Sequence, residues 1–280
     1  MALFDFLLFI VVGCVVGFFA GMFGIGGGIL IVPVLIFSYE QSGIPSSVLT
    51  HIAIGTSLFV IIFASFTSAY QHGKQRNIDW RSVFVLGFSS AVSALATTRL
   101  AAWLSGGHLR IVFGLLVMVS AIKMLTESET QAQKKLEFSS RPSVFGLIGV
   151  GLAAGIVAAL AGVGGAIVTI PMMYYFLNMP LKLAIGTSSA TIVITALFSV
   201  AGYILNGMGR AGLPEWSFGF VDLERGVALA VGTILMARVG AYVSFKTHPF
   251  RLRKLFALFV ILVSIYILVR WTPLEIPAGH

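Results

Sequence analysis

Gly17-Phe-Phe-Ala-Gly21-Met-Phe-Gly24-Ile-Gly26-Gly27-Gly28-Ile-Leu-Ile-Val-Pro33 is the stretch around which this chain is organised. A second copy lies 138 residues later and reads Gly155-Ile-Val-Ala-Ala-Leu-Ala-Gly162-Val-Gly164-Gly165-Ala166-Ile-Val-Thr-Ile-Pro171. In both copies glycines interrupt a long apolar segment, and a proline follows them. Because unpaired backbone groups are costly in lipid, such an interruption needs a structural or functional reason.

The composition predicts an all-α integral membrane protein with several spans. Hydrophobic residues make up 58% of the 280 residues and charged residues only 10%, whereas soluble domains average about 45–50% and about 25%. The formal charge of +8 comes from basic residues that lie mainly in short loops between apolar segments. The positive-inside rule explains this pattern better than nucleic-acid binding does, so membrane lipid is the expected surrounding and no nucleic-acid partner is expected.

The apolar segments form two homologous halves. Ala53-Ile-Gly-Thr-Ser57 reappears as Ala184-Ile-Gly-Thr-Ser188, and Arg99 matches Arg238. We therefore predict a first membrane repeat at 1–126, a cytoplasmic linker at 127–142 and a second membrane repeat at 143–280. Internal repeats of this kind are typical of secondary transporters. The eight apolar segments span about 3–37, 44–70, 80–104, 108–125, 143–177, 183–206, 226–245 and 252–271.

The distribution of positive charge predicts the topology. The first segment of each repeat is too long for one crossing, since a span needs roughly 20 residues. Arg99 and Arg238 lie within apolar segments and are left out of the count; if both segments turn back at their glycines, twelve of the other Lys and Arg lie on one side of the membrane and four on the other. Single crossings give the weaker division of ten to six. We therefore predict two re-entrant helix-turn-helix elements, inverted repeats, both termini outside and the linker in the cytoplasm.

The two glycine turns are the first candidate binding site. Two turns that meet near the midplane would direct backbone N–H groups and positive helix ends at an anion. The alternative is close packing of helices through small residues, which Gly17-x-x-x-Gly21 fits well. The glycines assigned to substrate binding are Gly24, Gly26, Gly27, Gly28, Gly162, Gly164 and Gly165.

Hydroxyl side chains extend this candidate site. Thr56 and Ser57, with their counterparts Thr187 and Ser188, could donate hydrogen bonds to a bound oxyanion. The alternative is that these hydroxyls bond to the preceding helical turn. His51 is expected near the first glycine turn, although a lone histidine more often has a structural role.

Other residues are expected to support the structure or gate it. Arg99 and Arg238 lie inside apolar segments, where they could act in gating or reach the headgroups. Pro33 and Pro171 are assigned the same gating or structural role. Asp79 and Asp222 precede segments three and seven and are predicted helix N-caps. The loop His72-Gly-Lys-Gln-Arg76 is predicted to be a cytoplasmic anchor.

Missing residue types exclude several functions. Apart from Asp5 at the very start of the first segment, no Asp or Glu falls inside an apolar segment, so a buried carboxylate relay for protons cannot be built. The breaks contain no serine nucleophile beside a histidine, so an intramembrane protease is disfavoured and no enzyme is expected. No cluster of Cys, His and acidic residues has metal-site spacing, and neither a metal nor a cofactor is expected.

The chain resembles the TauE/SafE family of sulfite-exporter-like permeases. The resemblance rests on the first glycine stretch with Pro33, its degenerate second copy, the repeated Gly-Thr-Ser and Ile78-Asp79-Trp80. The resemblance covers nearly the whole chain. It implies a bacterial-type inner-membrane transporter of sulfite, thiosulfate or organosulfonates, with the glycine motif on Gly24, Gly26, Gly27 and Gly28. Ala159 and Ala166 replace two glycines in the second copy, so the first turn is the stronger candidate for the ligand.

The sequence as a whole predicts a secondary transporter of a small sulfur oxyanion or sulfonate that works by alternating access. Without membrane carboxylates, we expect facilitated diffusion, anion exchange, or cotransport with a proton on histidine or on the substrate. A channel for a small anion or neutral solute remains an alternative, as does a membrane assembly factor that transports nothing. The glycine-rich faces would permit a homodimer.

Overall fold

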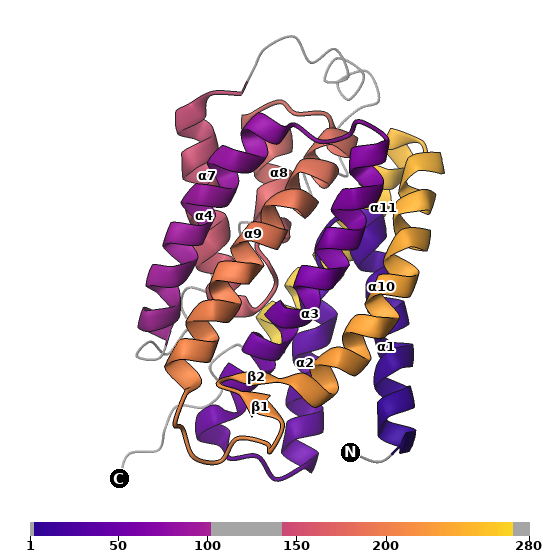
Figure 1. The fold of residues 1–280 in the computed structure, drawn as a ribbon. Coiled ribbons are helices and arrows are strands. Elements are labelled where there is room, and N and C mark those ends of the chain that lie inside the picture. Colours follow the sequence, from indigo (N-terminus) through magenta and orange to yellow (C-terminus); the bar gives the residue numbers. More distant parts are fainter. Residues whose placement is uncertain (1–2, 102–141, 271–280) are drawn as a thin grey trace.

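A computed structural model describes residues 3–101 and 142–270, which form a bundle of helices (Figure 1). The predicted segment 108–125 and nearly all of the linker 127–142 lie outside these residues. The described elements are α1 (Leu3–Phe23), α2 (Gly28–Gln41), α3 (Ser46–Lys74), α4 (Trp80–Ala101), α7 (Val144–Ala161), α8 (Ala166–Phe176), α9 (Leu181–Gly207), β1 (Ser217–Phe218), β2 (Val221–Asp222), α10 (Leu223–Lys246) and α11 (Pro249–Arg270).

Six of these helices are long and apolar enough to cross a membrane, namely α1, α3, α4, α7, α9 and α10. Helices α2 and α8 are apolar but shorter. A helix satisfies its backbone hydrogen bonds internally, which is why apolar runs of about 20 residues can exist in lipid. The prediction of an all-α, multi-pass membrane protein is therefore confirmed.

The first long apolar segment folds back on itself. In α1, Gly13, Gly17 and Gly21 lie in turn against the backbone of Leu229, Thr233 and Ala237, so α1 runs parallel to α10. After the glycine break, α2 returns. Its C-terminal Ser38 accepts a hydrogen bond from Arg225 at the start of α10. The hairpin of α1 and α2 thus starts and ends at the end of the bundle where α10 begins (Figure 1).

The second long segment repeats this arrangement from the opposite end. In α7, Gly151 and Gly155 lie against the backbone of Leu86 and Ser90, so α7 runs parallel to α4. Leu177, just beyond α8, lies against Gly146 near the start of α7. The hairpin of α7 and α8 therefore starts and ends at the end of the bundle where α4 begins.

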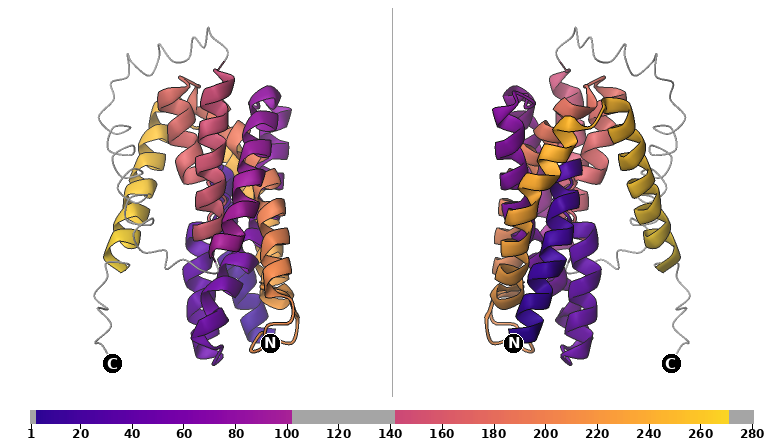
Figure 2. Two further views of the ribbon diagram at one scale, coloured as in Figure 1. Left: turned by 90° about the vertical axis from the view of Figure 1, so that its left-hand side faces the viewer. Right: turned by 90° about the vertical axis from the view of Figure 1, so that its right-hand side faces the viewer.

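The two halves of the sequence do not form separate bodies. Helix α1 packs along α10, α7 along α4, and α3 along α9, so each of these pairs joins one half to the other. The views in Figure 2 show α4 and α7 side by side on one face of the bundle and α1 and α10 on the opposite face. The largest buried cluster also draws from both halves, with Phe23 and Leu58 beside Ile167 and Ile192.

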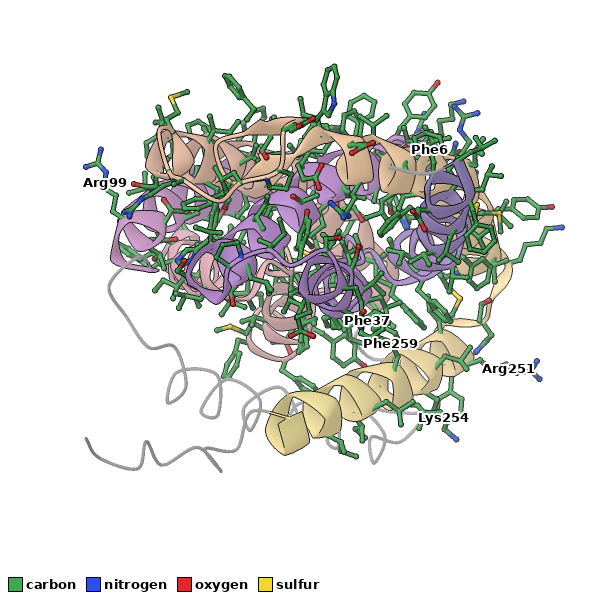
Figure 3. The ribbon with its side chains drawn as sticks, turned by 90° about the horizontal axis from the view of Figure 1, so that it is seen from below. Phe6, Phe37, Arg99, Arg251, Lys254 and Phe259 are labelled. Carbon is green, nitrogen blue, oxygen red and sulfur yellow. The ribbon has the colours of Figure 1, made fainter. Side chains whose placement is uncertain are left out.

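Short connections and one further helix complete the fold. The two-stranded hairpin of β1 and β2 leads from α9 into α10. Asp222 caps α10 by accepting hydrogen bonds from the amides of Glu224 and Arg225, as predicted. Helix α11 lies on the outside of the bundle, where Phe259 contacts the ring of Phe23 (Figure 3).

Candidate functional site: two glycine turns

The two glycine turns have nearly the same backbone conformation. The φ angles of Gly24, Gly26 and Gly27 are 66°, 73° and 85°, and those of Gly162, Gly164 and Gly165 are 66°, 73° and 81°. Side chains with a Cβ rarely adopt these angles. The glycine pattern is therefore explained by the backbone itself, before any ligand is considered.

The turns meet in the interior of the bundle. A Cβ on Gly28 would collide with the carbonyl oxygen of Gly162. The same carbonyl accepts a hydrogen bond of 2.8 Å from Ser57 Oγ on α3. The side chain of Ile61, which is fully buried, lies against Gly26, Gly28 and Gly164 and so contacts both turns.

Each turn opens a helix whose first amides point toward the junction. The amides of Leu30 and Ile31 reach back to the Gly27 carbonyl, and those of Val168 and Thr169 reach the Gly165 carbonyl. The amides before them, at the first helical positions, have no carbonyl within their own helix to accept a hydrogen bond. Two positive helix ends therefore lie close together, an arrangement that favours an anion.

The surroundings of the two turns differ. Ser65 Oγ lies near Gly26, and Ser189 Oγ lies near Gly24. The atoms nearest to Gly164 belong to Ile61 and Ile192. At Gly26 the first turn therefore has a hydroxyl group in addition to Ile61, whereas Gly164 has only aliphatic neighbours. The hydroxyl at the second turn, that of Ser57, donates to the Gly162 carbonyl.

The repeated Gly-Thr-Ser sequences hold loops of the opposite half. Gly55 lies against the carbonyl of Phe220, and Thr56 Oγ1 accepts a hydrogen bond of 2.9 Å from the Asp222 amide. A Cβ on Gly55 would collide with the Phe220 carbonyl, so glycine allows the loop to come close while the neighbouring threonine accepts a hydrogen bond from it.

The second copy makes the equivalent contacts with the loop before α4. Gly186 lies against the carbonyl of Asn77, and Thr187 Oγ1 accepts from the Asp79 amide at 3.0 Å. Both threonines thus have a structural partner. Their predicted contact with a substrate stays a prediction.

The two motif serines are not equivalent. Ser57 donates to the second glycine turn. Ser188, its counterpart, is fully buried, and its Oγ has no hydrogen-bond partner within the described part of the chain. Its predicted role in binding also remains a prediction.

His51 packs against the segment that leads into β2. Its ring stacks on Phe220 at a centroid distance of 5.2 Å, near the start of α3. The first turn contacts α3 at Ile61 and Ser65. Ten residues of helix separate His51 from Ile61, which is about 15 Å along the axis. The predicted role of His51 in substrate binding stays a prediction.

His72 also differs from its prediction. It lies in α3 rather than in a loop, and its side chain is fully buried. The ring packs edge-on against Phe245 at 4.8 Å, and neither ring nitrogen has a hydrogen-bond partner in the described ranges. The close approach of α9 at Gly186 covers this residue, so it cannot be a solvated anchor.

The remaining predicted residues lie away from the turns or inside the short helices. Arg99 and Arg238 are both exposed, and Figure 3 shows Arg99 pointing away from the bundle. Pro33 lies within α2 and Pro171 within α8. A gating role for these four residues stays a prediction.

A polar network that the sequence did not predict joins α2 to α10. Arg225 pairs with Asp222 at 2.9 Å, and Tyr39 donates to the same carboxylate at 3.1 Å. Arg225 also donates to Ser38 and Ser42 at 3.0 and 2.8 Å. Arg225 follows Asp222 by three residues, and at the other end of the bundle Ser82 follows Asp79 by three residues. Ser82 donates a hydrogen bond to Asp79, so this position holds no cation to form an equivalent ion pair.

These features define an integral membrane protein with two helix hairpins that meet at glycine turns. The chain belongs to the sulfite exporter TauE/SafE family, whose sequence model matches residues 9–267. The match covers nearly the whole chain. Family membership supports a membrane transporter and not an enzyme, in agreement with the prediction.

Relatives from distant organisms cover nearly the same length. A "probable membrane transporter protein" of Haemophilus influenzae is 31% identical over 92% of this chain and 96% of its own. Another, from Methanocaldococcus jannaschii, is 30% identical over 89% of this chain and 92% of its own. No solved structure gives a significant match.

Proposed function

We propose that this protein is a secondary transporter of small sulfur-containing anions, such as sulfite, thiosulfate or an organosulfonate. The observation that carries the proposal is the contact between the two glycine turns, at Gly28 and the Gly162 carbonyl. Two helices begin at this point, and their first amides have no partner in their own helix. The family name gives the substrate class, and the helix ends give a physical reason why an anion would bind.

The two hairpins act as re-entrant elements of two inverted repeats. Each starts and ends at one end of the bundle, and the two enter from opposite ends. Irregular backbone at membrane depth is tolerated where it is buried in protein or lines a cavity. With the predicted charge distribution, both termini and the hairpin of β1 and β2 face the outside of the bacterial inner membrane.

Transport takes place by alternating access around the junction of the turns. Gly55 and Gly186 bring a loop from the opposite half into close contact near each end of the bundle. A substrate site between them is exposed to one side when the contacts at that end open. The two ends would open in turn, as in other transporters built from inverted repeats.

Flux in proteoliposomes tests the proposal. The purified chain should take up radiolabelled thiosulfate or sulfite with saturation, and unlabelled anion inside the vesicles should accelerate uptake by counterflow. Linear, non-saturating flux would contradict the transporter proposal and indicate a channel. Absence of both flux and binding for every sulfur anion tried would favour a membrane assembly factor.

A further inference from the structure

The geometry points to Ser65 as the side chain that donates a hydrogen bond to the anion, which places the substrate against the first glycine turn. This inference rests on the proposed function and names a binding residue outside the Gly-Thr-Ser motif. Ser65 Oγ is buried, with 1% of the residue exposed, and has no hydrogen-bond partner in the described ranges. It lies 3.1 Å from the point where a Cβ on Gly26 would be.

An unused donor at this position needs an explanation. Serines in membrane helices commonly bond to a carbonyl one turn back, and Ser189 and Ser199 do so at 2.9 and 2.8 Å. Ser65 makes no such bond, although a buried hydroxyl without a partner costs free energy. A substrate oxygen at the first turn would remove that cost.

The neighbouring hydroxyls are already engaged. Ser68 and Ser189 hydrogen-bond to each other at 3.0 Å, and Ser189 also donates to the Ile185 carbonyl. Ser57 donates to the Gly162 carbonyl. Of these hydroxyls, Ser65 alone keeps a free donor beside the first turn.

The second turn offers no equivalent group. The counterpart of Ser65 in the second half is Ala196, and Gly164 faces the aliphatic side chains of Ile61 and Ile192. An oxyanion or sulfonate head therefore finds both helix amides and a hydroxyl donor at Gly26. At Gly164 it finds amides flanked by apolar groups.

The test compares Ser65→Ala with two matched variants in the full-length protein. Ser199→Ala removes a buried serine that is satisfied by the Thr195 carbonyl. Ala196→Ser adds a hydroxyl at the counterpart position. Thermal unfolding in detergent is followed while thiosulfate, sulfite or sulfoacetate is titrated, and KM for flux is measured in proteoliposomes.

Ser65→Ala should leave the melting temperature without anion unchanged or raised, because the lost hydroxyl had no partner. It should raise the anion concentration for half-maximal stabilisation, and KM, by about 10- to 100-fold, the loss expected for a hydrogen bond to a charged group. Ser199→Ala and Ala196→Ser should bind the anion as the wild type does, and Ser65→Thr should restore binding.

Two results would overturn the inference alone while the wild type still binds and transports. One is unchanged anion affinity in Ser65→Ala. The other is a lowered melting temperature without anion, which would show that the hydroxyl supports the fold. If the wild type neither binds nor transports any of the three anions, the proposed function itself fails and the inference fails with it.

Discussion

The two glycine turns share a backbone and differ in their surroundings. Corresponding φ angles agree within a few degrees, for example 73° at both Gly26 and Gly164. Ile61 packs against both turns, but the first turn also has Ser65 beside Gly26, where the second has Ile192 beside Gly164. The repeat therefore fixes the shape of both turns, whereas the side chains of α3 and α9 decide the chemistry of each.

The two ends of the bundle differ in a similar way. At both ends a threonine accepts a hydrogen bond from the amide of a loop aspartate. The end near Asp222 adds an ion pair with Arg225 and a hydrogen bond from Tyr39. The Asp222 end is therefore held by more polar contacts than the Asp79 end, and we expect it to be the more stable of the two.

The largest expected loss of stability comes from removing the aspartate at the more strongly held end. Asp222→Ala removes the α10 cap and leaves Arg225 without its carboxylate, so it should lower the free energy of unfolding by about 3–5 kcal/mol. Asp79→Ala should cost only about 1 kcal/mol. Thermal or denaturant unfolding in detergent measures both variants. Equal losses would contradict the inferred asymmetry.

The next effect concerns the contact between the turns. Gly28→Ala places a methyl group against the Gly162 carbonyl. It should destabilise the protein by about 1–3 kcal/mol and sharply reduce flux. The matched change Ala166→Gly, at the equivalent position, should cost at most about 1 kcal/mol. A Gly28→Ala protein with wild-type stability and flux would show that the turns do not pack as described.

A smaller effect is expected at the loop contacts. Thr56→Val removes the acceptor of the buried Asp222 amide, and Thr187→Val that of the partly buried Asp79 amide. Thr56→Val should lower the free energy of unfolding by about 1–2 kcal/mol, and Thr187→Val by about 1 kcal/mol or less because water can reach the Asp79 amide. Anion affinity should change little if these hydroxyls serve only the fold. A loss of affinity without loss of stability would restore their predicted role in substrate binding.

The smallest effect is expected at the two matched arginines. Arg99 and Arg238 are exposed, so Arg99→Gln and Arg238→Gln should each change the free energy of unfolding by less than about 0.5 kcal/mol. Flux should stay within about twofold of the wild type. A large fall in flux at unchanged stability would instead support the predicted gating role.

Much of the fold could be predicted from residue patterns. Hydrophobicity marked the spanning helices, and the repeated glycines marked both breaks because few other residues tolerate positive φ. Asp222 was recognisable as a cap from its place before an apolar run. The contrast between Ser65 and Ala196 was also present in the aligned repeats, although nothing in the sequence alone showed that this position faces Gly26.

The candidate site could be predicted only in outline. The glycines of both turns were identified, but His72 was placed in a loop, whereas it lies buried in α3. That error arose because burial at the end of a helix depends on its neighbours, and α9 approaches His72 closely at Gly186. The threonines of Gly-Thr-Ser were assigned to a ligand because the loops that they hold come from the other half of the chain.

By itself, the sequence determined that this is a membrane protein of the TauE/SafE family with two glycine-broken segments. Composition and glycine positions act locally, through hydration and backbone dihedrals, so they can be read residue by residue. Only the tertiary structure decided that the turns touch at Gly28 and Gly162, that Thr56 and Thr187 hold opposite loops, and that Ser65 keeps an unused hydroxyl. These outcomes depend on contacts between residues far apart in the chain, which packing alone sets.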